Sequence, residues 1–281
     1  MPNRRRRPLR GFALLTVAAL AVSLGLYLAY RHVQEVSHGC QANSGAAAVS
    51  LDPEQGALAA TIAGVAHARH VGTGAVTIAY ATAMQESHLH NLPAGDLDSI
   101  GVFQQRPSEG WGSPKNLMDP VYATGKFFDA LVRVPDYLHI PLAEAAQDVQ
   151  HSADGSAYSN YQQQAAQMAA AFTGLRPHSV WCWSFPDRPG RPQVAAMRSG
   201  LLHAFGRLDV RAAGSSGADP ATDIRIGRRA VGWTVAGWLV THATEYQIGN
   251  VRYADYQWSA SKASRGWTRD PSAPSGSVEL R

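Results

Sequence analysis

The chain of 281 residues is 45% hydrophobic and 16% charged, a composition typical of folded proteins and not of disordered ones. Five of its 25 basic residues are arginines within the first ten positions, so the other 20 nearly balance the 21 acidic residues. The basic pI of about 9.2 therefore comes from this tail. Because no basic face with interleaved aromatic residues follows the tail, we expect no nucleic-acid binding.

The N-terminal segment has the pattern of a membrane anchor. Residues 1–10 form a basic tail, and residues 11–30 are an uncharged, mostly apolar run of 20 residues. Such a run is long enough to cross a bilayer as a helix, and flanking arginines stay in the cytoplasm. We therefore predict a single-pass membrane protein whose bulk is extracytoplasmic, with residues 31–53 as a spacer. A cleaved signal peptide is the alternative, but the run exceeds a usual apolar core and no cleavage motif follows Tyr30.

The only two cysteines are Cys40 and Cys182, and both fall in the part predicted to face an oxidising compartment. A disulfide between them is the simple expectation. It would close a long loop and stabilise the fold by up to about 5 kcal/mol. Two unpaired thiols are the alternative. Lipid attachment at Cys40 is disfavoured, because a polar stretch separates it from the apolar run.

Residues 54–185 are predicted to form a mainly helical domain. Asp52 is a helix cap, followed by Pro53 at the first helical position, and this first helix runs to about Arg69. A second helix, Ala75 to Leu89, has small and apolar residues that suit burial. Further helices are expected over three ranges: Pro120 to Val134, Leu142 to His151 and Tyr158 to Thr173.

The composition changes after residue 185. Residues 186–222 read as a connection, with a short helix from Val194 to Arg207 and a linker from Ala212 to Ala221. Residues 223–281 are predicted to be a small α+β module. A helix over Ala230 to Gln247 precedes short strands. The aromatic residues of this module form either a carbohydrate-binding face or its small core.

Glu86 is the candidate catalytic residue. It falls in the last turn of the second helix, near the negative end of the helix dipole, which disfavours its charged form. Partial burial raises the pKa of a carboxyl group further. A carboxylic acid that stays protonated near neutral pH can act as a general acid.

Three segments in order resemble the lytic transglycosylase and goose-type lysozyme group. These are Glu86-Ser87 at a helix end, Gly101-Val-Phe-Gln104 about fifteen residues later, and Asp119-Pro-Val-Tyr-Ala-Thr-Gly125. The resemblance covers roughly residues 54 to 175. The loop around Gly101 looks closest to actinobacterial wall proteins of the lysozyme-like superfamily. The chain departs from the pattern at Val102-Phe103, where the family has Leu-Met, at Asp119, where it has Asn, and near Gln147 to Gly155, where an Asn-Ala-Gly segment is missing.

The resemblance implies a lysozyme-like fold and cleavage of the MurNAc-GlcNAc bond of peptidoglycan, with Glu86 as acid and then base. In the lytic route the substrate's own C6 hydroxyl attacks and leaves an anhydro sugar. The alternative is a non-catalytic protein that binds peptidoglycan or acts as a scaffold; a third possibility is a partner-binding role of the C-terminal module. The residues implied to contact substrate, including a supporting tyrosine, are Ser87, Ser99, Gly101, Phe103, Gln104, Gln105, Tyr158 and Tyr161.

Two loop aspartates and two histidine pairs are further candidates for chemistry. Asp96 and Asp98 are candidates for the second carboxylate that an inverting hydrolase needs, although loop aspartates more often form turns. Histidine pairs occur at positions 67 and 70 and at positions 88 and 90. Because no His-Glu-x-x-His or Cys-x-x-Cys motif accompanies them, we predict no metal site and no cofactor. The expected partners are glycan strands and, through the N-terminal helix, the membrane.

Overall fold

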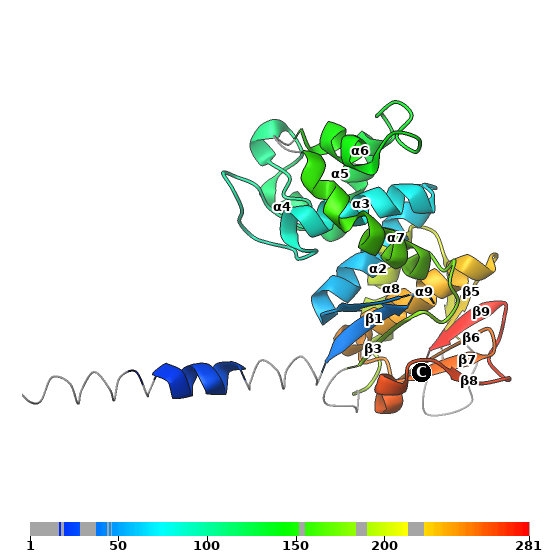
Figure 1. Ribbon diagram of the computed structural model, residues 1–281. Helices are drawn as coiled ribbons and strands as arrows, with labels where there is room; N and C mark the ends of the chain where they lie inside the picture. The colour runs from blue at the N-terminus through cyan, green and yellow to red at the C-terminus, as the bar shows by residue number, and fades with distance from the viewer. Residues whose placement is uncertain are drawn as a thin grey trace, which may run out of the picture. The chain divides into compact units, whose positions relative to one another are not determined.

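The computed structural model describes residues 17, 20–28, 38–43, 45, 47–151, 155–183, 190–212 and 222–280. The chain divides into two units, Met1–His38 and Gly39–Arg281. All of the labelled helices and strands in Figure 1 belong to the second unit. The described part is about 53% helical and 16% strand, and its strands form two antiparallel sheets.

The prediction of an N-terminal transmembrane helix is wrong. No helix in the described part of the chain is long and apolar enough to cross a membrane. Within residues 11–30 the structure describes helix at residues 17 and 20–28, and the rest of that range lies outside the described residues. A span needs about 20 helical residues in succession. The transmembrane part of the predicted fold class and the single-pass localisation depended on that helix and are corrected with it.

The predicted spacer contains two strands instead of irregular chain. Strands β1 (Gly39–Asn43) and β2 (Ala48–Leu51) pair antiparallel, and β3 (Val180–Trp183) pairs with the other edge of β1. Cys40 lies opposite Cys182 in this register, and the two form the predicted disulfide, which is confirmed. The bond joins positions 142 residues apart, so it ties the start of the compact unit to the end of its helical region.

Helix α2 (Pro53–Ala68) is the central helix of the compact unit. Asp52 caps it by accepting a hydrogen bond from the Gln55 N–H, and the Gln55 side chain in return accepts from the Asp52 N–H. Gly56 lets its first turn approach the disulfide, because a Cβ there would lie 2.6 Å from the Cys40 sulfur. The helix is buried on nearly all sides, which is typical of a helix inside a core.

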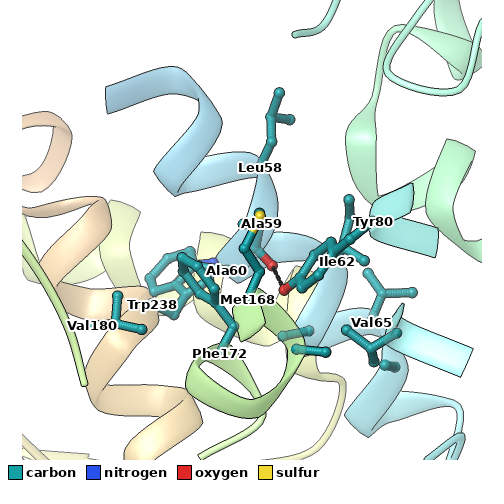
Figure 2. Packing of buried hydrophobic residues seen from close by; sticks show 14 of the residues in the cluster. Leu58, Ala59, Ala60, Ile62, Val65, Tyr80, Met168, Phe172, Val180 and Trp238 are labelled. Atoms are coloured by element: carbon teal, nitrogen blue, oxygen red, sulfur yellow. Dashed lines mark hydrogen bonds between the residues drawn. The ribbon is translucent and has the colours of Figure 1, made fainter. Parts of the chain in front are cut away.

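One hydrophobic core joins the predicted helical domain to the predicted C-terminal module. Helix α2 packs against α3, α5 and α7 on one side and against α8 and α9 on the other (Figure 1). Figure 2 shows Phe172 of α7 and Trp238 of α9 in the same cluster as the α2 side chains. The Tyr80 hydroxyl donates to the Ala59 carbonyl at 2.7 Å, which satisfies the one polar group of a fully buried ring.

The helical part follows the predicted order along the chain, with short helices and turns between the longer ones. Its elements are α3 (Thr73–Ser87), η1 (Pro107–Glu109), α4 (Pro114–Leu117), α5 (Pro120–Leu131), α6 (Leu142–Gln150), η2 (Gly155–Tyr161) and α7 (Gln162–Phe172). The predicted helix from Tyr158 is divided here, because its first turn is 3-10 and belongs to η2.

The C-terminal part is an antiparallel sheet covered by helices. The strand order is β4 (Asp209–Ala212), β5 (Thr222–Arg225), β9 (Ser277–Leu280), β6 (Asn250–Tyr253), β7 (Tyr256–Ser259) and β8 (Thr268–Arg269). The helical elements are α8 (Val194–Phe205), α9 (Arg229–Thr241), α10 (Ala243–Tyr246) and η3 (Ala260–Arg265). The predicted linker lies outside the described residues except for Ala212, which ends β4.

Aromatic side chains of the C-terminal part pack against one another. The ring of Trp233 contacts those of Tyr253 and Trp267, with centroids 5.2 Å apart in both pairs. Trp233, Tyr253 and Trp258 are buried. Of the two roles that the sequence left open for these rings, packing in a core is the one that their burial favours.

Candidate functional site

Glu86 lies in the last turn of α3, as the sequence predicts. The helix ends at His88, which adopts the left-handed conformation with φ of 52° and turns the chain away. The Glu86 side chain is half-buried. It is therefore accessible at one side while the protein surrounds the rest of its carboxyl group.

Two polar side chains from later elements converge on this carboxyl group. The hydroxyl of Tyr158, in η2, donates to Glu86 Oε1 at 2.6 Å. The side chain of Gln150, the last residue of α6, donates through Nε2 to the Phe103 carbonyl at 2.7 Å and lies close enough to Glu86 to lower the pKa of its carboxyl group. Tyr158 is almost fully buried, so its hydroxyl is fixed by packing. The carboxyl group is thus held by residues 64 and 72 positions further along the chain.

The pKa of Glu86 is raised above its ordinary value. Burial, which penalises the charged form, is the largest cause, and the hydrogen bonds from Tyr158 and Gln150 lower the pKa by less. Glu86 therefore keeps its proton to a higher pH than an ordinary glutamate. This is the protonation behaviour that a general acid needs.

Ser87 fixes the end of α3 against the following loop. Its hydroxyl donates to the Val102 carbonyl at 2.7 Å and accepts from the His90 N–H at 3.2 Å. The side chain is buried. The Glu-Ser pair seen in the sequence thus joins a half-buried carboxyl group to a hydroxyl group that positions the backbone of the following loop.

The N-terminal end of α2 braces the same turn from the other side. Asp52 Oδ2 lies 2.8 Å from His90 Nε2, and Gln55 Nε2 donates to the His88 carbonyl at 2.9 Å. The Asn91 N–H donates to Glu54 Oε1 at 3.0 Å. The residues that cap α2 therefore also hold the chain immediately after Glu86, and this link was not visible in the sequence.

The loop after α3 is closed by two isolated bridges, Leu92 with Gly101 and Ile100 with Gln105. Gly101 has φ of +79°, and a Cβ there would lie 2.6 Å from the Leu117 carbonyl oxygen. Both the backbone conformation and the lack of space therefore require glycine. Gln104 Nε2 donates to the Gly101 carbonyl at 3.0 Å. This bond caps the turn, whereas the resemblance implied a substrate contact for Gln104.

Besides Ser87, Gly101 and Tyr158, three more residues predicted to contact substrate are buried. Phe103 is fully buried and stacks on Phe127 with ring centroids 4.5 Å apart. The Gln105 Nε2 donates to the Ala123 carbonyl at 3.3 Å, and Ser99 is also buried. Buried side chains of this kind cannot contact a ligand on the surface. They instead pack against the core and fix the conformation of the loop.

Neither candidate for a second carboxylate lies in a catalytic setting. Asp98 accepts hydrogen bonds from the Ser108 N–H at 2.8 Å and from Arg106 Nε at 2.9 Å. These bonds lower its pKa to about 2, so Asp98 stays ionised and braces the loop. Asp96 is exposed, and its carbonyl accepts from the Ser99 N–H.

Two further predicted residues take structural positions. Tyr161 is half-buried at the start of α7 and packs against the core, whereas Tyr158 is the tyrosine that contacts Glu86. Asp119, in the place of the family's asparagine, caps α5 by accepting from the Val121 N–H at 2.9 Å. Among the described residues, no group of three or more His, Cys, Asp or Glu side chains is placed to hold a metal ion.

A pocket of about 520 Å³ is lined in part by the end of α6 and the residue after it. Val149 and His151, the neighbours of Gln150 in sequence, line it together with Trp111 and Lys126. Glu86 is not one of its lining residues. A half-buried tryptophan beside polar groups is a suitable surface for a sugar ring.

Gln150 is the member of this cluster that sequence reasoning missed. The segment from Gln147 to Gly155 lacks the Asn-Ala-Gly motif of the resembled family, so no family pattern pointed to Gln150. The available signal was a polar side chain at the end of a predicted helix. Comparison of the chain with protein-family models and with curated proteins finds no match.

Proposed function

We propose that the protein cleaves the MurNAc-GlcNAc bond of peptidoglycan, with Glu86 as the catalytic acid. The observation that supports this most is a half-buried carboxyl group with a raised pKa, held by Tyr158 and Gln150 at the end of α3. A neutral carboxylic acid in such a position can protonate the glycosidic oxygen as the bond breaks. Once ionised, it is stabilised by the Tyr158 hydroxyl and can accept a proton in the second step.

The lytic route fits the surroundings of Glu86 better than the inverting hydrolytic route. Inversion needs a second carboxylate that activates a water molecule, and the two carboxyl groups are then about 6.5–9.5 Å apart. Asp98 is committed to Arg106 and Ser108, and Asp96 is exposed. In the lytic route one glutamate serves twice, since the attacking group is the substrate's own C6 hydroxyl.

The substitution Glu86→Gln tests the proposal. It keeps the shape of the side chain and removes its acid, so release of soluble fragments from purified peptidoglycan is expected to stop. Asp98→Asn serves as the matched control, because it makes the same chemical change on a carboxylate that braces the loop. Undiminished release by the Glu86→Gln protein would refute the role of Glu86.

Mass spectrometry of the products distinguishes the two routes. Anhydro-muramyl ends are expected from the lytic reaction, whereas reducing ends would refute it. Wild-type protein that sediments with peptidoglycan but releases no fragments would instead support the non-catalytic binding role.

A further inference from the structure

A second pocket, of about 630 Å³, lies where four segments meet. These segments are the end of α2, the turn before α3, the turn between α8 and β4, and the turn between β5 and α9. The residues that line the pocket are His67, His70, Val71, Gly72, Arg207, Leu208, Asp209, Arg225, Ile226, Gly227, Arg228 and Val231. The pocket is at the opposite end of α3 from Glu86, and none of the groups that hold Glu86 contributes to it.

The lining carries an excess of positive charge. It includes three arginines, Arg207, Arg225 and Arg228, and only one carboxylate, Asp209. Asp209 forms its ion pair with Arg211, outside the lining, at 2.7 Å, and it also lies opposite Arg225 in the pairing of β4 with β5. Within the part of the chain that the structure describes, none of the three lining arginines forms an ion pair. Their guanidinium groups are therefore available to an external anion.

The pKa of His67, which also lines the pocket, responds to this positive charge. Burial is the largest cause of its lowered pKa, and the nearby charge of Arg228 and the neighbouring His70 lower it further. A bound anion would offset the positive charge of Arg228 at this position.

Two long helices also begin at this pocket. Gly72 is the N-cap of α3, which has 15 residues, and Arg228 is the N-cap of α9, which has 13. Neither helix start has a side-chain cap or an acidic residue in its first turn. Free N–H groups and the positive end of the helix dipole therefore add to the arginine charge at two points of the lining.

We propose that this pocket binds a phosphate or diphosphate group carried by a small organic molecule. Arginine forks match phosphate oxygens in bidentate geometry, and helix N-termini donate to the remaining oxygens. The volume is in the range of small-molecule sites and exceeds what an inorganic ion fills. Val71, Leu208, Ile226 and Val231 supply half-buried apolar surface for the organic part. This site does not depend on the proposed glycosidase activity.

Isothermal titration of the full chain with inorganic pyrophosphate, at constant ionic strength, tests the site. Wild-type protein is expected to bind, and Arg228→Gln to bind at least about tenfold more weakly, as expected for loss of one charge-assisted contact. Arg198→Gln is the matched control, because Arg198 is exposed on α8 outside the pocket. Its affinity is expected to equal that of wild type. Absence of pyrophosphate binding, or equal weakening in both variants, would overturn the proposal.

A measurement on the wild-type protein alone removes any dependence on the folding of a variant. In amide NMR spectra, pyrophosphate is expected to shift the signals of Thr73 and Gly74, in the first turn of α3, and of Arg229 at the start of α9. An equal response to sulfate at matched ionic strength, or shifts spread over surface arginines elsewhere, would show general charge screening and refute a phosphate site.

Discussion

The hydrogen bond from Tyr158 to Glu86 gives the sharpest test of the candidate site. Tyr158→Phe removes one hydroxyl group and keeps an aromatic ring that is almost fully buried. The lost bond is 2.6 Å long and ends on Glu86 Oε1. The variant is therefore expected to fold and to change chiefly the balance between the neutral and ionised forms of Glu86.

The size of this change follows from the two forms of the acid. A hydrogen bond to a charged group contributes about 1.5–3 kcal/mol and one to a neutral group about 1 kcal/mol. The substitution thus disfavours the ionised form by about 0.5–2 kcal/mol, which is about 2- to 30-fold in the ionisation equilibrium. Since this bond lowers the pKa of Glu86 in the wild type, its loss raises that pKa further.

Carbon-detected NMR of glutamate labelled at the carboxyl group measures the titration of Glu86 directly. The midpoint is expected to move to higher pH in Tyr158→Phe and to stay in place in the control Tyr161→Phe. If Glu86 acts in its protonated form, the alkaline limb of peptidoglycan turnover moves with it. An unchanged or lower midpoint in Tyr158→Phe, or the same displacement in the control, would refute the reasoning.

Three other predictions concern stability in urea unfolding. The folded pKa of Glu86 is raised above 4.5, so the stabilisation that its protonation gives to the folded state is complete below pH 4.5 and is lost as the pH rises through the folded pKa. Glu86→Gln has no such loss, and its free energy of unfolding should therefore rise relative to wild type between acid and neutral pH. Joint replacement of Cys40 and Cys182 by alanine should cost about 5 kcal/mol for a separation of 142 residues; a loss below about 1 kcal/mol would contradict the chain-entropy argument. Buried His242 has its pKa lowered from 6.5 to about 4, so its contribution is present above pH 6.5 and falls by about 3 kcal/mol towards pH 4. His242→Gln should abolish most of that acid loss, and an unaltered pH dependence would exclude His242 as its source.

Local features of the fold were predictable from the sequence because they depend on residues that are close together in the chain. The capping of α2 by Asp52 needs only Gln55 three positions later, and the last turn of α3 contains Glu86 because no helix breaker intervenes after Gly74. The disulfide was also predictable, since a chain with two cysteines has only one possible intramolecular pair.

The transmembrane helix is a prediction from local composition that was wrong. An apolar run describes how well a segment would tolerate lipid, but it does not establish a continuous helix of membrane-spanning length. Similarly, the small residues of the predicted spacer gave no sign of strands, because β1 and β2 obtain their order from pairing with each other and with β3, about 140 residues further on.

The sequence by itself determined which residue carries the candidate acid, how its helix starts and ends, and which cysteines pair. Only the tertiary structure decided that Gln150 and Tyr158 meet at Glu86, that Phe103 and Gln105 face the core, and that three arginines line a pocket at the far end of α3. The physical reason is that capping and helix formation are short-range. The burial that raises the pKa of Glu86, and the field of a pocket, are summed over segments that are distant in the chain.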